Sequence, residues 1–437
     1  MSRFLGIDLG TSYFKAGIYD DAGSLRGLGR EAVPKVSDGE RCELHADDFW
    51  RALRAAVTAA LAEAGIPASA LDGISYSSQA NSFILLDDSG NPLTPLVLWP
   101  DGRAARGCAP LAQLASKSDF MEKTGIGIVP NGEFMLAKLD WFRVNRPEIW
   151  SRTASVMTIS DYLVFALTGR KAGDLSTASM TALLDVRQDH WWPEALESFG
   201  LKANMLSEPI PIGTLAGHVT ADGAALAGLS KGTPVYVGAL DHYAVAIGAG
   251  VTAGHRISES TGTVLACVGY REGYAPREGV ITAAGPYAGH FFQLAFDGNG
   301  ATAVEWYQKH YAPEQTIAQL EEAARKVTAG CDGLTALPQS DSYPGLSGFR
   351  NIRPEHTPAH FLRAIFESTA RTLVQLVDRL DPEKQVGEMI PSGGGARNPL
   401  WLQIKADMLQ RTYIPQPTGE LATKGAAMIC KIQNPQI

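Results

Sequence analysis

Alternating apolar and polar residues at the start of the chain predict a β-hairpin. Residues 4–19 form two apolar runs, and residues 8–12 between them read Asp-Leu-Gly-Thr-Ser. β-Branched and aromatic residues favour strands, and Gly10 permits a tight turn. Residues 255–269 repeat the order of strand, Thr-Gly-Thr turn and strand. A hairpin that occurs once in each half of the chain predicts a duplicated domain.

Helical periodicity occurs in four further segments. Their apolar residues recur every three to four positions, which is the spacing of one helix face. Gly65 predicts the end of the first of these helices, and Thr357 followed by Pro358 predicts the start of the last. The segments are residues 47–64, 134–144, 161–167 and 357–380. Strands and helices in this mixture predict an α/β protein.

One carboxylate, Asp241, lies among the small and apolar residues between Gly238 and Gly250. Residues 233–238 have strand character, and an apolar helix start follows Asp241. Two roles are open for an acid at such a junction. Asp241 is either the N-cap of the helix or a base aimed into a cleft.

The length and charge of the chain limit its fold and partners. A chain of 437 residues is too long for one ordinary core, so we expect two or three domains. Glycines are dense between residues 240 and 255, and we expect domains at residues 1–245 and 246–437. The net charge of −8 argues against a nucleic acid or an anionic membrane as the main partner.

The cysteines and the N-terminus indicate a cytoplasmic protein. Five cysteines lie far apart without a Cys-x-x-Cys pair, so neither a disulfide scaffold nor a structural zinc site is supported. A sparse and odd set is typical of reduced thiols. An acid follows the N-terminus before any signal-peptide core, and no apolar run approaches the ~18 residues of a membrane span.

Both hairpin turns have residue types that suit phosphate. Backbone N–H groups and hydroxyls at Gly10, Thr11 and Ser12 suit phosphate oxygens, and Asp8 at the strand end suits a hydrated Mg²⁺. An ordinary glycine hairpin is the alternative for either turn alone. The pair of turns predicts two domains that bind a polyphosphate from both sides.

Polar residues after two later strands predict contacts to a hydroxylated ligand. Trp99, Asp101 and Arg103 alternate after a strand-like run. They form either a hydroxyl-binding rim or an aromatic side chain packed under a surface Asp–Arg pair. Gln79-Ala80-Asn81 is a second polar group at a strand end.

Six motifs occur in the order found in the FGGY family of carbohydrate kinases, which the chain resembles from Gly6 to about Met428. The resemblance implies the actin/Hsp70/hexokinase-type ATPase fold, in which two duplicated ribonuclease-H-like α/β domains enclose an interdomain cleft. The motifs are Asp8-Leu-Gly-Thr-Ser12, Trp99-x-Asp101-x-Arg103, Lys138-Leu-Asp-Trp141, Gly238-Ala-Leu-Asp241, Thr261-Gly-Thr263 and Ser392-Gly-Gly-Gly-Ala-Arg-Asn398.

The same resemblance implies roles for the matched residues. Asp241 corresponds to the catalytic base that accepts the proton of the sugar hydroxyl as it attacks the γ-phosphate of ATP. Asp8 corresponds to the residue that organises Mg²⁺ through water. Phosphate and nucleotide contacts are implied for Gly10, Thr11, Ser12, Lys15, Gly262, Thr263, Ala301, Glu305, Gly394 and Asn398. Sugar contacts are implied for Gln79, Ala80, Asn81, Trp99, Asp101, Arg103, Asp241 and His242.

These roles predict an ATP- and Mg²⁺-dependent kinase of a small sugar, a ketopentose such as xylulose or ribulose. A polyol kinase of the glycerol or erythritol type is the second interpretation, and an actin- or Hsp70-like ATPase without sugar-kinase activity is the third. Residues 79–82, Gln-Ala-Asn-Ser, differ from the Gln-Met-His-Gly of xylulokinases and the Gln-Arg-Glu-Thr of glycerol kinases. Because dimers are common among relatives, a homodimer is a further expectation.

Overall fold

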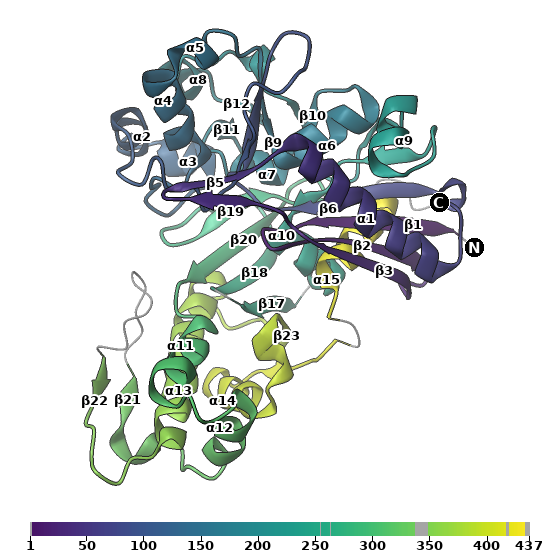
Figure 1. The fold of residues 1–437 in the computed structure, drawn as a ribbon. Helices are drawn as coiled ribbons and strands as arrows, with labels where there is room; N and C mark the ends of the chain where they lie inside the picture. Colours follow the sequence, from purple (N-terminus) through teal and green to yellow (C-terminus); the bar gives the residue numbers. More distant parts are fainter. Residues whose placement is uncertain (1, 254, 263, 337–347, 417–418, 433–437) are drawn as a thin grey trace. The chain divides into compact units, whose positions relative to one another are not determined.

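The chain forms two compact units built from interleaved segments (Figure 1). The computed structural model describes residues 2–253, 255–262, 264–336, 348–416 and 419–432. The first unit consists of Met1–Gly248, Arg271–Phe292 and Glu420–Ile437, and the second of Ala249–Tyr270 and Gln293–Gly419. The division of the sequence into domains at residues 1–245 and 246–437 stays a prediction.

A mixed sheet forms the centre of the first unit. β1, β2 and β3 are antiparallel neighbours, whereas β6 runs parallel to β1, β15 and β16. The strands in order are β14 (Leu215–His218), β15 (Pro234–Tyr236), β6 (Gly73–Ser78), β1 (Arg3–Leu9), β2 (Tyr13–Asp20) and β3 (Leu25–Ala32), and β16 (Ala239–Leu240) pairs with β6.

The first unit also contains smaller sheets and most of the helices. Its second sheet has the order β4 (Val36–Asp38), β5 (Arg41–Leu44), β8 (Leu96–Val97), β7 (Phe83–Leu86) and β9 (Ser155–Thr158). Two strand pairs are β10 (Ala172–Asp174) with β13 (Glu208–Ile210) and β11 (Leu184–Asp185) with β12 (His190–Trp191). The helices are α1 (Ala46–Ala64), α2 (Ala109–Ala115), α3 (Phe120–Thr124), α4 (Met135–Asn145), α5 (Pro147–Trp150), α6 (Ile159–Thr168), α7 (Leu175–Ser179), α8 (Pro193–Ser198), α9 (Ala221–Ala227), α10 (Asp241–Gly248) and α15 (Leu421–Ile432), with 3₁₀ turns η1 (Ala68–Ala70) and η2 (Ala203–Met205).

The second unit repeats the topology of the first around its own hairpin. β1 has an antiparallel partner, β2, and a parallel partner, β6, and β17 likewise has β18 and β23. This repeat confirms the predicted α/β class and the duplication, whereas the cleft between the domains stays a prediction. The sheet order in this unit is β20 (His290–Asp297), β18 (Leu265–Glu272), β17 (Arg256–Thr261), β23 (Glu388–Ser392) and β24 (Thr412–Tyr413), and β21 (Thr335–Ala336) pairs with β22 (Phe349–Arg350). β19 (Ile281–Ala284) belongs to the segment Arg271–Phe292 of the first unit. The helices are α11 (Thr302–Tyr311), α12 (Ile317–Ala324), α13 (Pro358–Leu380) and α14 (Pro399–Leu409), with 3₁₀ turns η3 (Val251–Ala253), η4 (Cys331–Gly333) and η5 (Gly394–Arg397).

The two faces of β1 meet different helices. Leu5 and Ile7 belong to the buried core that also contains the apolar face of α1. Gly6 lies against α15, because a Cβ atom on Gly6 would be 1.9 Å from the carbonyl oxygen of Thr423. Strand residues two positions apart share a face. Asp8 therefore lies on the α15 face of the sheet.

Local signals set the predicted helix ends. α1 ends at Gly65, whose φ of 65° lies in the left-handed region that glycine adopts readily. α13 follows Thr357 and begins with Pro358, as the sequence predicted.

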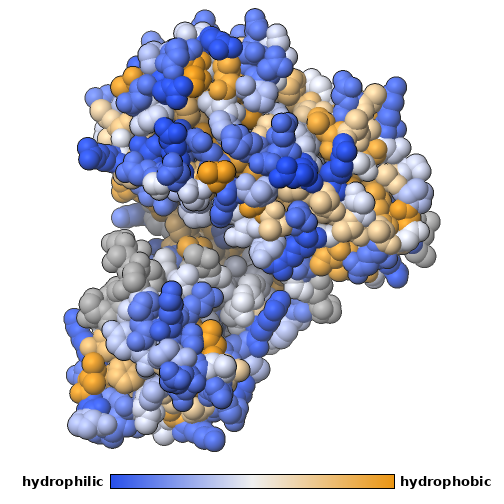
Figure 2. Space-filling model, viewed as in Figure 1, coloured by the Kyte–Doolittle hydropathy of each residue, from blue (hydrophilic) through white to orange (hydrophobic). Residues whose placement is uncertain are grey.

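On the face in Figure 2, hydrophilic residues cover most of the surface and apolar residues occur in small groups between them. None of the helices in the described part of the chain has both the length and the apolar composition to span a bilayer.

α10 and α15 approach each other closely where each has a glycine. A Cβ atom on Gly425 would lie 1.8 Å from the carbonyl oxygen of Ala244, and one on Gly248 would lie 2.2 Å from that of Leu421. The side chains at a contact set the distance between packed helices. Only glycine permits this distance.

Gly425→Ala is expected to lower the free energy of unfolding by about 1–3 kcal/mol, as overpacking does. This loss opposes the gain of about 1 kcal/mol that alanine offers over glycine in a helix. Urea-induced unfolding measures the difference. Gly387→Ala is the control, because a Cβ atom there would meet nothing within 4 Å. If Gly425→Ala is as stable as the wild type, the close contact is wrong.

Asp161 is a buried acid at the start of α6. Thr158 and Asp161 form a capping box at this helix end, and a Cβ atom on Gly173 would lie 2.1 Å from Asp161 Oδ1. Burial is the main cause that raises the pKa of Asp161 to about 7 from an ordinary 3.8. The stability that this carboxyl group contributes is therefore complete below pH 3.8 and is lost as the pH rises through 7.

Asp161→Asn is expected to be more stable than the wild type at pH 8.5, by about 4 kcal/mol at most, because asparagine cannot ionise. The difference should shrink as the pH falls towards 5. Urea-induced unfolding at three pH values checks this, with the exposed Asp88→Asn as the control for charge removal. A difference that does not change with pH contradicts the prediction.

Candidate active site

Asp8 lies near the end of β1 in a cluster of polar groups. Ser77 Oγ on β6 donates a hydrogen bond of 2.8 Å to Asp8 Oδ1, and Lys15 lies directly opposite Asp8 on β2. Burial raises the pKa of Asp8 to about 6; Lys15 and Ser77 act to lower it, and Asp241 acts to raise it. Asp8, Lys15, Ser77 and Asp241 therefore form one electrostatically coupled group, called here the carboxylate cluster.

Lys15 has an acidic partner that sequence reasoning missed. Its Nζ lies 2.7 Å from Glu420 Oε2, with both side chains about one quarter exposed (24% and 23%). The hydroxyl of Tyr19 donates to the carbonyl oxygen of Glu420 at 3.1 Å and contacts Thr423 Oγ1 at 2.8 Å. Glu420 is 405 positions from Lys15, so no local pattern could have paired them.

Asp241 is the first residue of α10 and is partly buried. Its Oδ1 accepts a hydrogen bond of 2.6 Å from the backbone amide of His242. This contact satisfies one amide at the helix start. An N-cap side chain accepts from the amide two or three residues after it, so the cap interpretation stays a prediction. The role of Asp241 as a base stays a prediction, as does the sugar contact of the partly buried His242.

Hydrogen bonds join the first hairpin turn, residues 10–12, to the predicted sugar residues. Trp99 Nε1 donates to Thr11 Oγ1 at 2.7 Å, and Thr11 Oγ1 donates to Gln79 Oε1 at 3.2 Å. The turn has glycine at position 10, where a Cβ atom would lie 2.8 Å from the carbonyl oxygen of Tyr13, and Ser12 is exposed. Thr11, Gln79 and Trp99 thus form one network.

Lys138 holds the backbone of Trp99, one member of this network. It is fully buried, and its Nζ donates to the carbonyl oxygens of Trp99 at 2.6 Å and Leu98 at 3.2 Å. Burial lowers the pKa of Lys138 to about 8. The sequence marked Lys138 only as part of a motif, whereas the structure shows that it holds the backbone of Trp99.

Asp101 and Arg103 form an ion pair, but the pair is buried and not on the surface. Arg103 Nε lies 2.6 Å from Asp101 Oδ1, with side-chain exposures of 6% and 0%. Asp101 Oδ2 also accepts from the amide of Cys42 at 2.7 Å, and Arg103 pairs with Glu43. These contacts are structural, so a sugar contact by either residue stays a prediction.

Asn81 caps a helix through its side-chain oxygen. It adopts a left-handed backbone with φ of 58°, and its Oδ1 accepts a hydrogen bond of 2.9 Å from the amide of Met135, the first residue of α4. The neighbouring Ala80 is partly buried. The carboxamide nitrogen of Asn81 is the group that a sugar contact would use.

The substitution Asn81→Asp separates the role of Asn81 as a helix cap from its predicted role as a sugar contact. Aspartate keeps the oxygen that accepts from Met135 and loses the nitrogen donor, so the melting temperature should stay close to that of the wild type. If Asn81 contacts the sugar, kcat/KM should change unequally across a panel of sugars. Asn81→Ala is the comparison, because loss of the cap should cost about 1 kcal/mol of stability. Unchanged kcat/KM values in Asn81→Asp would exclude the sugar contact.

The second unit brings two predicted nucleotide residues, Gly262 and Ala301, together. The amide of Ala301, just before α11, donates to the carbonyl oxygen of Gly262 at 2.7 Å. A Cβ atom on Gly395 would lie 2.7 Å from Thr261 Cβ, so the triple-glycine turn packs on the end of β17. Gly262 and Ala301 are thus adjacent, and the predicted Thr263 lies outside the described residues.

The other predicted nucleotide residues have different surroundings. Asn398 is buried and is the N-cap of α14, since its Oδ1 accepts from the amide of Trp401 at 3.1 Å. Glu305 is exposed on α11, and Gly394 is exposed at the start of η5. Their contacts with a nucleotide stay predictions.

A buried ion pair lies at the end of β17, next to Thr261. Lys405 Nζ contacts Glu259 Oε1 at 2.8 Å and Thr261 Oγ1 at 2.6 Å, with side-chain exposures of 0% for Lys405 and 1% for Glu259. Burying a charge is costly unless it is paired and hydrogen-bonded. The pair holds the residue before Gly262, and no sequence motif had indicated it.

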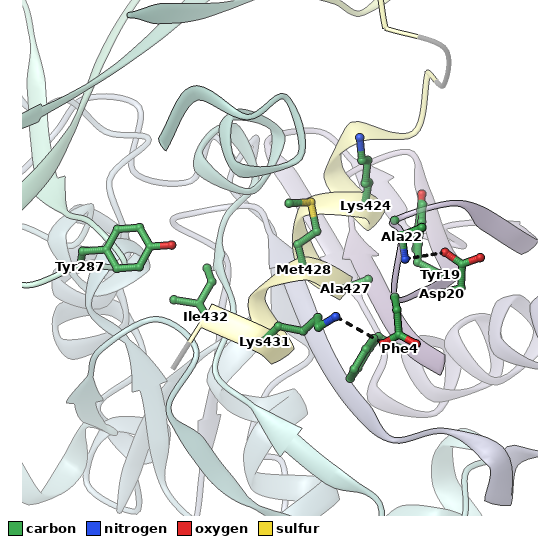
Figure 3. Close-up of a pocket in the computed structure, with 12 residues that line it drawn as sticks. Phe4, Tyr19, Asp20, Ala22, Tyr287, Lys424, Ala427, Met428, Lys431 and Ile432 are labelled. Carbon is green, nitrogen blue, oxygen red and sulfur yellow. Dashed lines mark hydrogen bonds and ion pairs between the residues drawn. The ribbon is translucent and has the colours of Figure 1, made fainter. Parts of the chain in front are cut away.

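A cavity of about 400 Å³ lies beside α15 (Figure 3). Lys424, Met428 and Lys431 of α15 and Phe4 of β1 line it, together with Tyr287. None of the predicted site residues is among its lining residues. The cavity is therefore separate from the carboxylate cluster.

Comparison with known proteins assigns the family. The N-terminal domain model of the FGGY family of carbohydrate kinases matches residues 3–248, and the C-terminal domain model matches residues 266–433. The chain belongs to the FGGY family of carbohydrate kinases. This membership confirms the predicted resemblance and the predicted carbohydrate kinase activity, for which ATP is the phosphoryl donor.

Individual relatives align over nearly the whole chain. A xylulose kinase of Lactococcus lactis is 29% identical over 98% of this chain and 87% of its own length. An L-xylulose/3-keto-L-gulonate kinase of Escherichia coli is 27% identical over 98% and 88%. The crystal structure of xylulose kinase from Rhodospirillum rubrum has a TM-score of 0.88 at 26% identity and covers 99% of this chain and 90% of that one. The likeness supports the predicted actin-type ATPase fold.

Proposed function

We propose that this kinase phosphorylates a hydroxyl of a ketopentose such as xylulose or ribulose. Two relatives that align over 98% of the chain carry the names of xylulose and L-xylulose kinases. The observation that supports the chemistry is the carboxylate cluster, in which one cation, Lys15, lies opposite Asp8, and Ser77 pairs with both Asp8 and Ala239, two residues before Asp241. Phosphoryl transfer requires mainly positioning and charge neutralisation.

In this proposal Asp241 is the general base. Its carboxylate accepts the proton of the sugar hydroxyl while the hydroxyl oxygen forms a bond to the γ-phosphorus of ATP. The bond between that phosphorus and the bridging oxygen breaks, and ADP leaves. The helix start holds the carboxylate through the amide of His242, and such a base contributes about 10²–10⁴-fold to the rate.

The donor set near Asp8 fits Mg²⁺. Within the described residues, no group of three or more His, Cys, Asp or Glu side chains could hold a metal on its own. Mg²⁺ usually binds through one or two carboxylates together with water and substrate phosphates, which agrees with Asp8 as an outer ligand. Bound there, the ion would neutralise charge on the phosphates. Lys15 would contact the transferring phosphate, and the backbone amide of Thr11 and the hydroxyl of Ser12 would donate to phosphate oxygens.

The second unit would hold the nucleotide through Gly262, Ala301 and Gly394. Ala301 is the residue whose amide already contacts Gly262, so the phosphate turn and the start of α11 form one surface. Family membership argues against an ATPase without sugar-kinase activity. A cytoplasmic location and a homodimer remain predictions.

Asp241→Ala is expected to lower kcat for the sugar by about 10²–10⁴-fold, because the base is removed, while ATP affinity changes little. Coupled ADP release and calorimetric ATP binding measure the two quantities. Asp222→Ala is the matched control, since Asp222 is an exposed aspartate in the first turn of α9. A variant at Asp241 with near wild-type kcat would disprove the role of base.

A substrate panel tests the sugar class. D-Xylulose, L-xylulose, D- and L-ribulose, glycerol and erythritol are assayed with ATP and Mg²⁺ by coupled ADP release. We expect the highest kcat/KM for a ketopentose. The highest value for glycerol or erythritol would instead establish the polyol-kinase interpretation.

A further inference from the structure

The segment 173–185 contains a buried acid that the proposed chemistry does not use. Asp174 ends β10 and is the N-cap of α7, because its Oδ1 accepts from the amide of Thr177 at 2.7 Å. Asp174 is 1% exposed and Ser176 is 0% exposed. A buried carboxylate is expensive unless its oxygens are hydrogen-bonded. The hydrogen-bond partners of Asp174 therefore indicate which elements this carboxylate stabilises.

Asp174 holds the hydroxyl hydrogen of Ser176, so the oxygen of Ser176 can accept from the backbone that leads to Asp241. Ser176 Oγ donates to Asp174 Oδ1 at 2.6 Å and accepts from the amide of Leu240 at 3.0 Å. A serine hydroxyl has one hydrogen to donate, and Asp174 takes it. The lone pairs of Ser176 Oγ thus remain for Leu240, the residue before Asp241.

The same segment is held from its other side by β6. Ala239 and Leu240 of β16 pair with Ser77 and Ser78, and Ser77 is the residue that donates to Asp8. A Cβ atom on Gly238 would lie 1.9 Å from the carbonyl oxygen of Tyr76 on β6. The backbone that leads into Asp241 is therefore fixed between β6 and α7.

Asp174 also reaches β6 directly. Its Oδ2 accepts a hydrogen bond of 3.0 Å from the hydroxyl of Tyr76. Tyr76 is 1% exposed, so this bond is shielded from water. One buried carboxylate thus joins three elements: β6 through Tyr76, α7 through its cap, and β16 through Ser176.

We propose that Ser176, oriented by Asp174, is a positioning residue for the carboxylate of Asp241. The inference rests on the proposed role of Asp241 as the base. A displacement of about 1 Å in a reacting group can reduce the rate by about 10²-fold. Removal of the Ser176 hydroxyl leaves the amide of Leu240 without this buried acceptor, while the phosphate turn at residues 10–12 keeps its own contacts.

Ser176→Ala is expected to lower kcat by about tenfold or more and to leave KM for ATP and for the sugar within about threefold. Ser179→Ala is the matched control: Ser179 lies on the same helix, is also 0% exposed, and donates to the carbonyl oxygen of Leu175 at 2.7 Å. If Ser176 only stabilises the fold, Ser176→Ala and Ser179→Ala should change kcat to a similar degree. Equal kcat values for the two variants overturn the proposal.

Amide hydrogen exchange gives a readout independent of activity. The Leu240 amide should exchange about fivefold faster or more in Ser176→Ala and at the wild-type rate in Ser179→Ala. If Ser176→Ala does not fold, Ser176→Cys keeps a weak hydrogen-bonding group of similar size and should show the same effects to a smaller degree. A folded variant with unchanged Leu240 exchange and full kcat overturns the proposal.

A double variant separates this inference from the role of Asp241. Ser176→Ala should lower kcat in the wild-type background and have no further effect in Asp241→Ala, because residues that act through one group are not additive. Full additivity in the double variant overturns the positioning role. If Asp241→Ala itself keeps near wild-type kcat, the proposed base fails, whatever Ser176→Ala shows.

Discussion

The close backbone contact among β1, α10 and α15 is the constraint on which the first unit depends. Gly6, Gly248 and Gly425 lack the Cβ atoms that would collide with neighbouring backbone. α15 from the end of the chain can therefore pack closely on β1 from its start and on α10 from its middle. Because Asp8 follows Gly6 on β1 and Asp241 begins α10, this contact also determines where both carboxylates lie.

Charge burial on this face is balanced by specific partners. Burial of Asp8 favours its protonated form, and the opposing contributions of Lys15 and Ser77 leave its pKa at about 6. Lys15 in turn pairs with Glu420 at 2.7 Å. A carboxyl group with a pKa close to neutrality changes its ionisation when a nearby charge changes. The charge on Asp8 therefore depends on the groups around it.

Several predicted ligand residues also stabilise the fold through one of their atoms. The side-chain oxygens of Asn81 and Asn398 cap α4 and α14, and Thr11 accepts a hydrogen bond from Trp99. A residue held in this way keeps a fixed orientation, so its remaining atoms are preorganised for a ligand. The buried pair Lys405–Glu259 acts similarly beneath Thr261.

The sequence by itself determined the features that depend on neighbouring residues: the two hairpins, the helix ends at Gly65 and Thr357, the α/β class and the family. It also singled out Asp8 and Asp241, because each stands alone at the end of a strand-like run. Only the tertiary structure decided which side chains surround these carboxylates and the residues beside them. Glu420, Ser77 and Ser176 are distant in sequence from the residues they contact, and the exposure of the Asp101–Arg103 pair depended on Cys42 and Glu43. A local pattern predicts which face of a helix or strand a residue occupies. The side chain that the residue contacts depends on how distant segments of the chain pack.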